Sequence, residues 1–288
     1  MPRTSRARAG RPIGESFREY GRGVAGGLLF SLPLLYTMEV WHAGFAMPPH
    51  RQLAYVLLAM VLLFGYNRYS GLHADTTWTE IAIDSVEELG IGLVLSAIVL
   101  LLIGRITAEQ DTSEIIGRIV VEAVTVAIGV SVGTAQLGAD AGDEEPRAAD
   151  RGGGSLGAQL TLALCGAVLF AANIAPTEEI VMIGTEMGGL HLAALGLATM
   201  VLAALVLYFS DFHGARRWAR AEGGFAMVRG TVVTYAVGLV ASAGILWLFG
   251  RFDGMGAVAI VGQTVALGVA STLGASAGRL LLQAGTGD

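Results

Sequence analysis

The sequence predicts an all-α polytopic membrane protein with about eight transmembrane helices, arranged as two parallel four-helix repeats about a pseudo-two-fold axis along the membrane normal. Of the 288 residues, 53% are hydrophobic and 15% are charged, and the mean hydropathy is +0.62, which is unusual for a water-soluble domain. Apolar segments long enough to cross a bilayer recur along the chain, and the second half repeats features of the first.

Eight apolar segments have the length of a membrane span, because a hydrocarbon core of about 30 Å requires roughly 20 residues of helix. The first span follows six arginines. We expect it to remain in the protein, since it is too long for a secretory signal and lacks a small-residue cleavage site. The expected spans are residues 23–45, 51–69, 82–104, 115–137, 157–184, 191–210, 228–250 and 256–279.

Arginine sets the expected orientation, because all 18 basic residues are arginine. With a cytoplasmic N-terminus, 14 of them fall on the inside and four fall outside, namely Arg51, Arg105, Arg118 and Arg251. This bias follows the positive-inside rule. We therefore expect a multi-pass protein of the bacterial inner (cytoplasmic) membrane with both termini in the cytoplasm.

The chain divides into four segments by composition. An Arg-rich cytoplasmic arm (1–22) precedes the first repeat (23–137), and a Gly-rich, acidic segment (138–155) precedes the second repeat (156–288). The segment 138–155 has no hydrophobic periodicity, which is typical of a flexible linker.

The internal repeat becomes visible when the chain is shifted by about 140 residues. Glu39 then falls on Glu179. After a six-residue insertion, GLVLSAIVLLLIGRI (92–106) aligns with GLVASAGILWLFGRF (238–252), with nine identities in fifteen positions. The second helices also match, and AIGV aligns with ALGV in the last helices. Each half has an even number of spans, so the two copies are expected to be parallel.

Glu39 and Glu179 lie at equivalent positions inside the first span of each half. A charged carboxylate there costs about 2.5–3.5 kcal/mol even on a lenient scale, so the repeated acid requires a compensating reason. A proline, Pro33 or Pro176, precedes each one, and a proline inside a span frees carbonyl groups that can bind ions. The segment NIAPTEE adds three more oxygen ligands, from Asn173, Thr177 and Glu178.

Two explanations for these glutamates remain open. The oxygen ligands suit a proton or a hard cation such as Na⁺, Mg²⁺ or Ca²⁺. Alternatively, the glutamates pair with Arg105 and Arg251, which are also repeat-equivalent and lie at a similar expected depth at the outer ends of the third helices. In that case the charges only hold helices together.

The third helix begins with WTEIAIDSVEELG, which places four acids on one face. They form either an acidic vestibule on the cytoplasmic side or the solvated start of an amphipathic helix. The deeper pair, Glu87 and Glu88, aligns with Val233 and Thr234 inside an apolar span, so we expect this pair within the membrane.

Two further patterns concern helix packing. In the fourth helix Glu122 follows Arg118 by one turn, so we expect these two residues to form an internal ion pair. Gly-xxx-Gly spacings, as at Gly129 and Gly133, are expected to serve close packing within the bundle. Dimerisation through these glycines is the alternative, and a homo-oligomer remains open.

We do not expect an enzyme. The tandem Glu178 and Glu179 are similar to the acids of intramembrane CAAX-type proteases, but the arginine that this pattern places four residues after the second glutamate is replaced by Ile183. The sequence also contains no HExxH, GxSxG or P-loop motif, and no cofactor is expected.

Several segments together, namely the Arg-rich start, YTMEVW, DSVEELGIG and NIAPTEEIVMIG, resemble a bacterial family of integral membrane proteins known only as a domain of unknown function. The likeness covers nearly the whole chain. It implies the multi-span architecture, but it implies no activity and no ligand.

The leading hypothesis is a membrane transporter or channel for a cation or proton, with intramembrane glutamates at the interface of the two repeats. The acids toward the outside would be Glu39, Glu178 and Glu179, and those toward the inside Glu87 and Glu88. The second hypothesis is a structural, sensory or assembly component of the membrane that transports nothing. In both cases the lipid bilayer is the expected partner and nucleic acid is not.

Overall fold

The computed structural model of the chain describes residues 13–70, 77–137, 155–210 and 224–284, and all regular structure within these ranges is helical. Seven of the described helices are long and apolar enough to cross a membrane. The number reaches the expected eight only if the bent pair of α1 and α2 is counted as one span. The helices are α1 (Ile13–Leu35), α2 (Met38–Ala46), α3 (Pro49–Ser70), α4 (Trp78–Leu102), α5 (Thr112–Leu137), α7 (Leu156–Ile174), α8 (Glu178–Glu186), α9 (Gly189–Ser210), α11 (Gly224–Leu248) and α12 (Ala257–Ala284).

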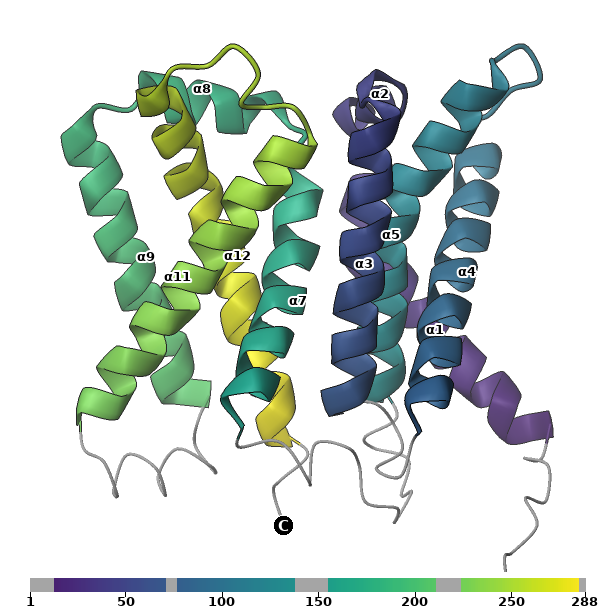
Figure 1. The fold of residues 1–288 in the computed structure, drawn as a ribbon, viewed down its shortest axis with the longest axis horizontal. Helices are drawn as coiled ribbons and strands as arrows, with labels where there is room; N and C mark the ends of the chain where they lie inside the picture. Colours follow the sequence, from purple (N-terminus) through teal and green to yellow (C-terminus); the bar gives the residue numbers. More distant parts are fainter. Residues whose placement is uncertain (1–12, 71–76, 138–154, 211–223, 285–288) are drawn as a thin grey trace, which may run out of the picture.

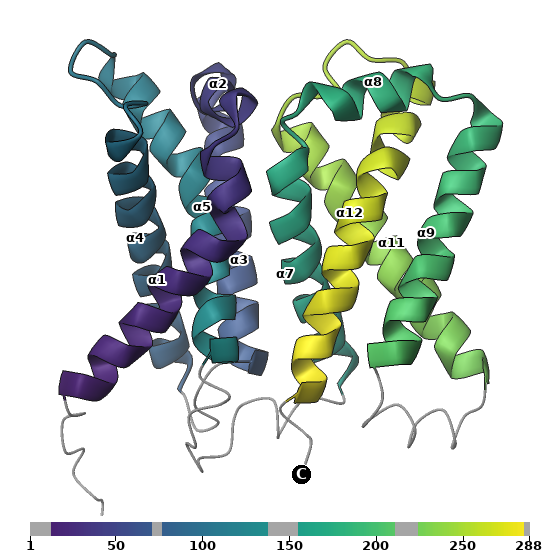
Figure 2. The ribbon, with the colours of Figure 1, turned by 180° about the vertical axis from the view of Figure 1, so that it is seen from behind.

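The helices form two groups that stand side by side, α1 to α5 and α7 to α12 (Figures 1 and 2). In chain order, each group has one long helix, one nine-residue helix and three long helices. The short helices α2 and α8 lie at one end, called here the α2/α8 end, and α1 begins and α12 ends at the opposite end (Figure 2). Most of the expected arm (1–22) and linker (138–155) lies outside the described residues, although α1 already begins at Ile13.

The first and fifth expected spans are not continuous helices, which corrects the interpretation of residues 23–45 and 157–184. α1 meets α2 at 87°, and α8 lies across the end of its group (Figure 2). In both breaks the amide of a threonine, Thr37 or Thr177, donates to the carbonyl three residues earlier (3.0 Å). Pro176 lies inside the second break, where its missing N–H costs no helical hydrogen bond, whereas Pro33 lies within α1.

Glycines allow the helices of each group to cross in direct contact. A Cβ on Gly26 of α1 would lie 2.3 Å from the Cα of Gly133 of α5, and a Cβ on Gly166 of α7 would lie 2.1 Å from the carbonyl oxygen of Gly274 of α12. Gly133 and Gly274 belong to Gly-xxx-Gly pairs, so these pairs serve packing within the chain, as expected.

The short helices are held against α5 and α12 by a similar approach of backbones. A Cβ on Gly117 would lie 1.9 Å from the carbonyl oxygen of Gly44, and a Cβ on Gly262 would lie 1.9 Å from that of Gly184. Gly117 and Gly262 are 145 residues apart, whereas the AIGV and ALGV segments are 139 residues apart. The packing of the short helices thus relates α5 and α12 by an offset that differs from the one relating the AIGV and ALGV segments.

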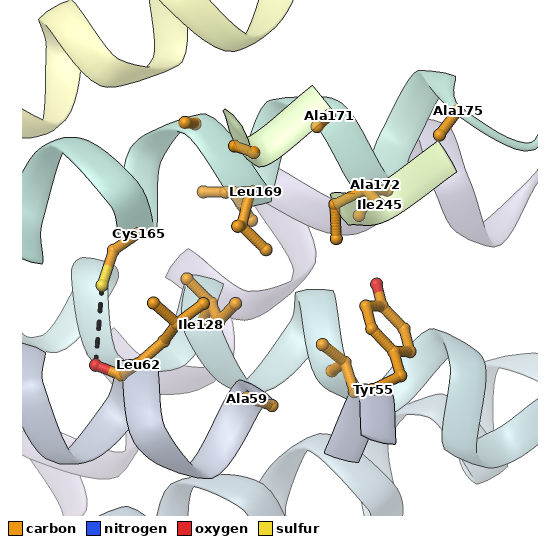
Figure 3. Packing of buried hydrophobic residues seen from close by; sticks show 14 of the residues in the cluster. Tyr55, Ala59, Leu62, Ile128, Cys165, Leu169, Ala171, Ala172, Ala175 and Ile245 are labelled. Carbon is orange, nitrogen blue, oxygen red and sulfur yellow. Dashed lines mark hydrogen bonds between the residues drawn. The ribbon is translucent and has the colours of Figure 1, made fainter. Parts of the chain in front are cut away.

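The two groups share a core along α3 and α7, with a smaller contribution from α11 (Figure 3). The thiol of Cys165 donates to the carbonyl of Leu62 (3.5 Å). The ring of Tyr55 meets that of Phe249 edge-on, with ring centres 5.6 Å apart. Buried apolar residues from both groups form one continuous cluster, so the groups are packed together and not merely tethered.

Candidate functional site

The glutamates expected inside the first spans lie on the short helices at the α2/α8 end. Glu39 is in the first turn of α2 and is half-buried, whereas Glu178 and Glu179 are in the first turn of α8 and exposed. The positive end of each helix dipole favours carboxylates at these positions. The helix breaks therefore place the three acids at the ends of the spans and not within them.

The two arginines expected to pair with Glu39 and Glu179 have other partners. Arg251 binds Glu178, with Nη1 3.1 Å from Oε1. The guanidinium of Arg105 lies over the ring of Trp41, 4.5 Å from its centre, in a cation–π contact. Neither of the two expected ion pairs is formed in the described chain.

Side chains already bind the carbonyl groups that the breaks set free. The indole of Trp41 donates to the carbonyl of Leu35 (3.0 Å), and Nε of Arg251 donates to that of Ala175 (3.2 Å). The hydroxyl of Thr37 donates to the carbonyl of Pro33 (2.5 Å). These carbonyl oxygens therefore have protein partners, and the breaks alone do not form an ion site.

Asn173 and Thr177 are also directed to backbone carbonyls. The amide of Asn173 donates to Leu169 (2.6 Å), and the hydroxyl of Thr177 donates to Ile174 (2.8 Å). Both side chains therefore bind backbone carbonyls of α7. Within the described ranges no three His, Cys, Asp or Glu residues form a group that could hold a metal ion.

A polar network does form within the candidate spans of the first group, toward the end opposite α2 and α8. Oε2 of Glu88 accepts from the amide of Asn67 on α3 (2.7 Å), and Oδ1 of Asn67 accepts from the hydroxyl of Ser131 on α5 (3.1 Å). The same amide also lies 3.2 Å from the hydroxyl of Ser85. Glu88 is ten residues inside α4, about 15 Å from its start at 1.5 Å per residue. We call Glu88, Asn67, Ser131 and Ser85 the inner network.

The neighbouring acids of α4 behave as the start of a helix. Glu80 and Thr77 form a capping box, in which each side chain binds the backbone N–H of the other. Glu87 is exposed and accepts a hydrogen bond from the hydroxyl of Tyr20 on α1. The amphipathic start thus fits Glu80. The intramembrane position expected for Glu87 and Glu88 stays a prediction, and of the two Glu88 is the less exposed.

The expected ion pair between Arg118 and Glu122 is wrong. Arg118 binds Glu114, one turn earlier on α5, and donates to the carbonyl of Arg105 (2.6 Å). A glutamate N-terminal to its cationic partner has the more favourable orientation for such a pair on a helix. The carboxyl group of Glu122 is consequently left fully buried, and neither oxygen has a hydrogen-bond partner among the described residues.

The second group carries a cation in the corresponding region. Nη1 of Arg279 on α12 donates to the hydroxyl of Thr234 (2.6 Å), and Nη2 donates to Oε1 of Gln159 on α7 (3.1 Å). Thr234 is the residue that aligns with Glu88 in the sequence. The first group thus carries an acid, and the second an arginine, in a network of polar side chains.

Sequence reasoning missed Asn67 and Ser131 as partners of Glu88 and treated Glu122 as paired. An asparagine inside the span 51–69 was the available signal for the inner network, because an amide in a span requires a hydrogen-bond partner. Glu114 and Glu122 both lie one helical turn from Arg118. The sequence favours Glu114 as its partner only because a glutamate N-terminal to its cation has the more favourable orientation.

One comparison with known proteins gives a match. The family model described as "Putative integral membrane protein (DUF2391)" matches residues 19–282. No curated protein and no solved structure matches the chain. The matched range begins within α1 and ends within α12, so it covers all the helices described above.

Proposed function

The chain belongs to the DUF2391 family of integral membrane proteins, and on this premise we propose that it is a transporter or channel for a proton or a small cation. The inner network carries the proposal. Glu88 lies well inside a candidate span and has an amide as its hydrogen-bond partner, with no arginine bound to it in the described chain. An ionisable group in a span is costly and commonly marks an ion or proton path.

The proposed path uses acids near both ends of the bundle. Glu87 and Glu88 would form its inner part, and Glu39, Glu178 and Glu179 would attract cations at the outer entrance. The distribution of arginines supports a cytoplasmic position for both termini, and hence an outward position for the α2/α8 end, in a bacterial inner membrane. The apolar core between the two helix groups would separate the inner acids of the path from the outer acids.

We further propose that the two groups are parallel copies related by a pseudo-two-fold axis along the membrane normal. The 140-residue sequence match and the common order of helices support this relation. The close approaches of Gly117 to Gly44 and of Gly262 to Gly184 support it independently. In such an arrangement, movement of one group relative to the other would expose a site first to one side of the membrane and then to the other side.

The second candidate is a structural, sensory or assembly component of the membrane. It is favoured by the α2/α8 end, where Arg251 binds Glu178 and Arg51 binds Asp253. Such pairs join helices and require no ion. This candidate leaves the inner network unexplained, which is why we place it second.

Ion flux into liposomes tests the proposal. The purified full chain is reconstituted with an internal pH dye and challenged with Na⁺, K⁺, Mg²⁺, Ca²⁺ and Mn²⁺. We expect wild-type protein to carry a proton or one of these cations. Glu88→Gln should abolish this flux, although its side chain keeps an oxygen that can accept from Asn67. Glu186→Gln, at the exposed end of α8, should retain the flux and serves as the control. Absence of flux for every ion in well-folded wild-type protein would favour the second candidate.

The same assay tests the outer entrance. Glu39→Gln and Glu179→Gln remove one carboxylate each without removing an ion pair of the described chain. A lower flux at low cation concentration would support an attracting role, because fixed charges raise the local cation concentration. Unchanged flux in both variants would restrict the path to the inner acids.

A further inference from the structure

Glu122 is a carboxyl group enclosed by protein on all sides. It lies in the middle of α5, the most deeply buried of the candidate spans, and its exposed fraction is 0%. The adjacent side chains Val121 and Ala123 are also buried. Since neither carboxyl oxygen has a hydrogen-bond partner in the described part of the chain, a charged carboxylate would be far less favourable here than a neutral acid.

No arginine of the described residues forms an ion pair with Glu122. Arg118 is one turn away, but it is held by Glu114 and by the carbonyl of Arg105, and its guanidinium lies 5.5 Å from the ring centre of Phe45. Within the described ranges no hydrogen bond reaches either oxygen of the Glu122 carboxyl.

The hydroxyl of Tyr55 is a second buried polar group without a partner in the described chain, and it lies on a helix that packs against α5. Helices α1, α2, α3, α4 and α7 all pack against α5. Tyr55 is itself fully buried, and its hydroxyl forms no hydrogen bond within the described chain. Its ring packs on Phe249 of the second group, and Figure 3 shows the hydroxyl directed toward that group.

Packing alone does not require an acid at this position. The spacing of 145 residues between α5 and α12 places Leu267 opposite Glu122 in the second group, and Leu267 is also fully buried. A leucine therefore fills the corresponding space. Two polar groups on neighbouring helices are thus buried without partners in the described chain. They indicate a site at which the missing partner is a bound species and not another side chain.

We propose that Glu122 is an occluded proton-binding site within α5 of the first group. The inference rests on the proposed function and adds a site to it. One proton binds a carboxylate oxygen to give the neutral acid and leaves as the same proton, so no other bond forms or breaks. Proton binding removes the charge that the apolar surroundings disfavour, which makes the site compatible with a closed core.

Infrared spectroscopy of the full chain in liposomes tests the site directly, because a protonated carboxyl group has a carbonyl band that a carboxylate and an amide lack. At neutral pH we expect such a band in the wild type and in Glu88→Gln, and its loss in Glu122→Gln. Glu122→Leu, which introduces the residue found at position 267, should also lose it and provides a second variant if the glutamine variant folds poorly.

The outcomes separate the site from the proposed function. A band assigned to Glu122, together with flux that is lost in folded Glu122→Gln, supports both. A band without flux for any ion supports the proton site and overturns transport. The proton site is overturned if flux occurs without the band, or if the band persists in Glu122→Gln. It is also overturned if Na⁺ removes the band at constant pH, and that result indicates that a cation binds in place of the proton.

Discussion

Arg51 and Asp253 join the two helix groups at the α2/α8 end through a bidentate ion pair. Nη1 and Nη2 of Arg51, at the start of α3, lie 2.7 and 2.8 Å from the two carboxylate oxygens of Asp253, in the loop after α11. The guanidinium also lies over the ring of Trp247, 5.5 Å from its centre. Gly250 has a φ of 74°, a backbone conformation that favours glycine, and a Cβ there would lie 2.8 Å from Nη1 of Arg51.

Acid should weaken this connection between the groups. The hydrogen bonds and positive charge of Arg51 hold the pKa of Asp253 below its usual value of 3.8. The pair therefore contributes stability above the pKa of the unfolded chain, and this contribution is lost as the pH falls through the lower pKa of the folded protein. We expect the thermal unfolding midpoint of wild-type protein to fall on acidification below about pH 4 more than that of Asp253→Asn. Equal acid sensitivity of the two proteins would show that the pair does not hold the groups.

The crossing of α1 and α5 should not tolerate a methyl group. Gly26→Ala places a Cβ 2.3 Å from the Cα of Gly133, so the two backbones must move apart. Overpacking of this kind costs about 1–3 kcal/mol of unfolding free energy, or more when backbone must shift. Gly21→Ala on the same helix meets nothing within 4 Å and is the matched control. Chemical unfolding in detergent measures the difference, and equal stabilities would mean that the helices do not cross at Gly26.

The inner network should contribute to stability as well as to function. Asn67→Ala removes the amide from Glu88 and the acceptor from Ser131, and leaving buried polar groups without partners costs about 1–3 kcal/mol. Ser85→Ala should cost less, because the bond between Asn67 and Glu88 remains. Unfolding free energies of the two variants test this order, and the reverse order would contradict the network.

The span architecture was predictable from the sequence because hydropathy and length determine which segments can cross a bilayer. The breaks were only partly predictable. Pro176 marks one of them, but Pro33 lies within α1, and the turn follows at the residues before Thr37. Hydropathy also could not show that the segments beyond the breaks lie across the bundle end, because α2 and α8 are as apolar as parts of a span.

The candidate site was less predictable, since it depends on which side chains meet across helices. Arg118 has a glutamate one turn away on either side, and only the packing shows that Glu114 binds it while Glu122 is enclosed. Repeat symmetry also directed attention to Glu39 and Glu179, whereas the half-buried Glu88 and the buried Glu122 align with neutral residues in the second group. The residues that distinguish the two halves are therefore the stronger functional candidates.

Arg251 should stabilise the break between α7 and α8 mainly through its bond to the backbone. Glu178→Gln removes an ion pair in which the glutamate side chain is 65% exposed, and such pairs contribute about 0.2–1 kcal/mol. Arg251→Leu removes the same pair and also leaves the buried Ala175 without a partner for its carbonyl, which adds about 1–3 kcal/mol. We expect Arg251→Leu to lower the unfolding free energy clearly more than Glu178→Gln, and to speed amide hydrogen exchange in α8. If the two substitutions cost the same, the ion pair and not the carbonyl bond fixes the break, and the structural candidate for this end of the protein becomes stronger.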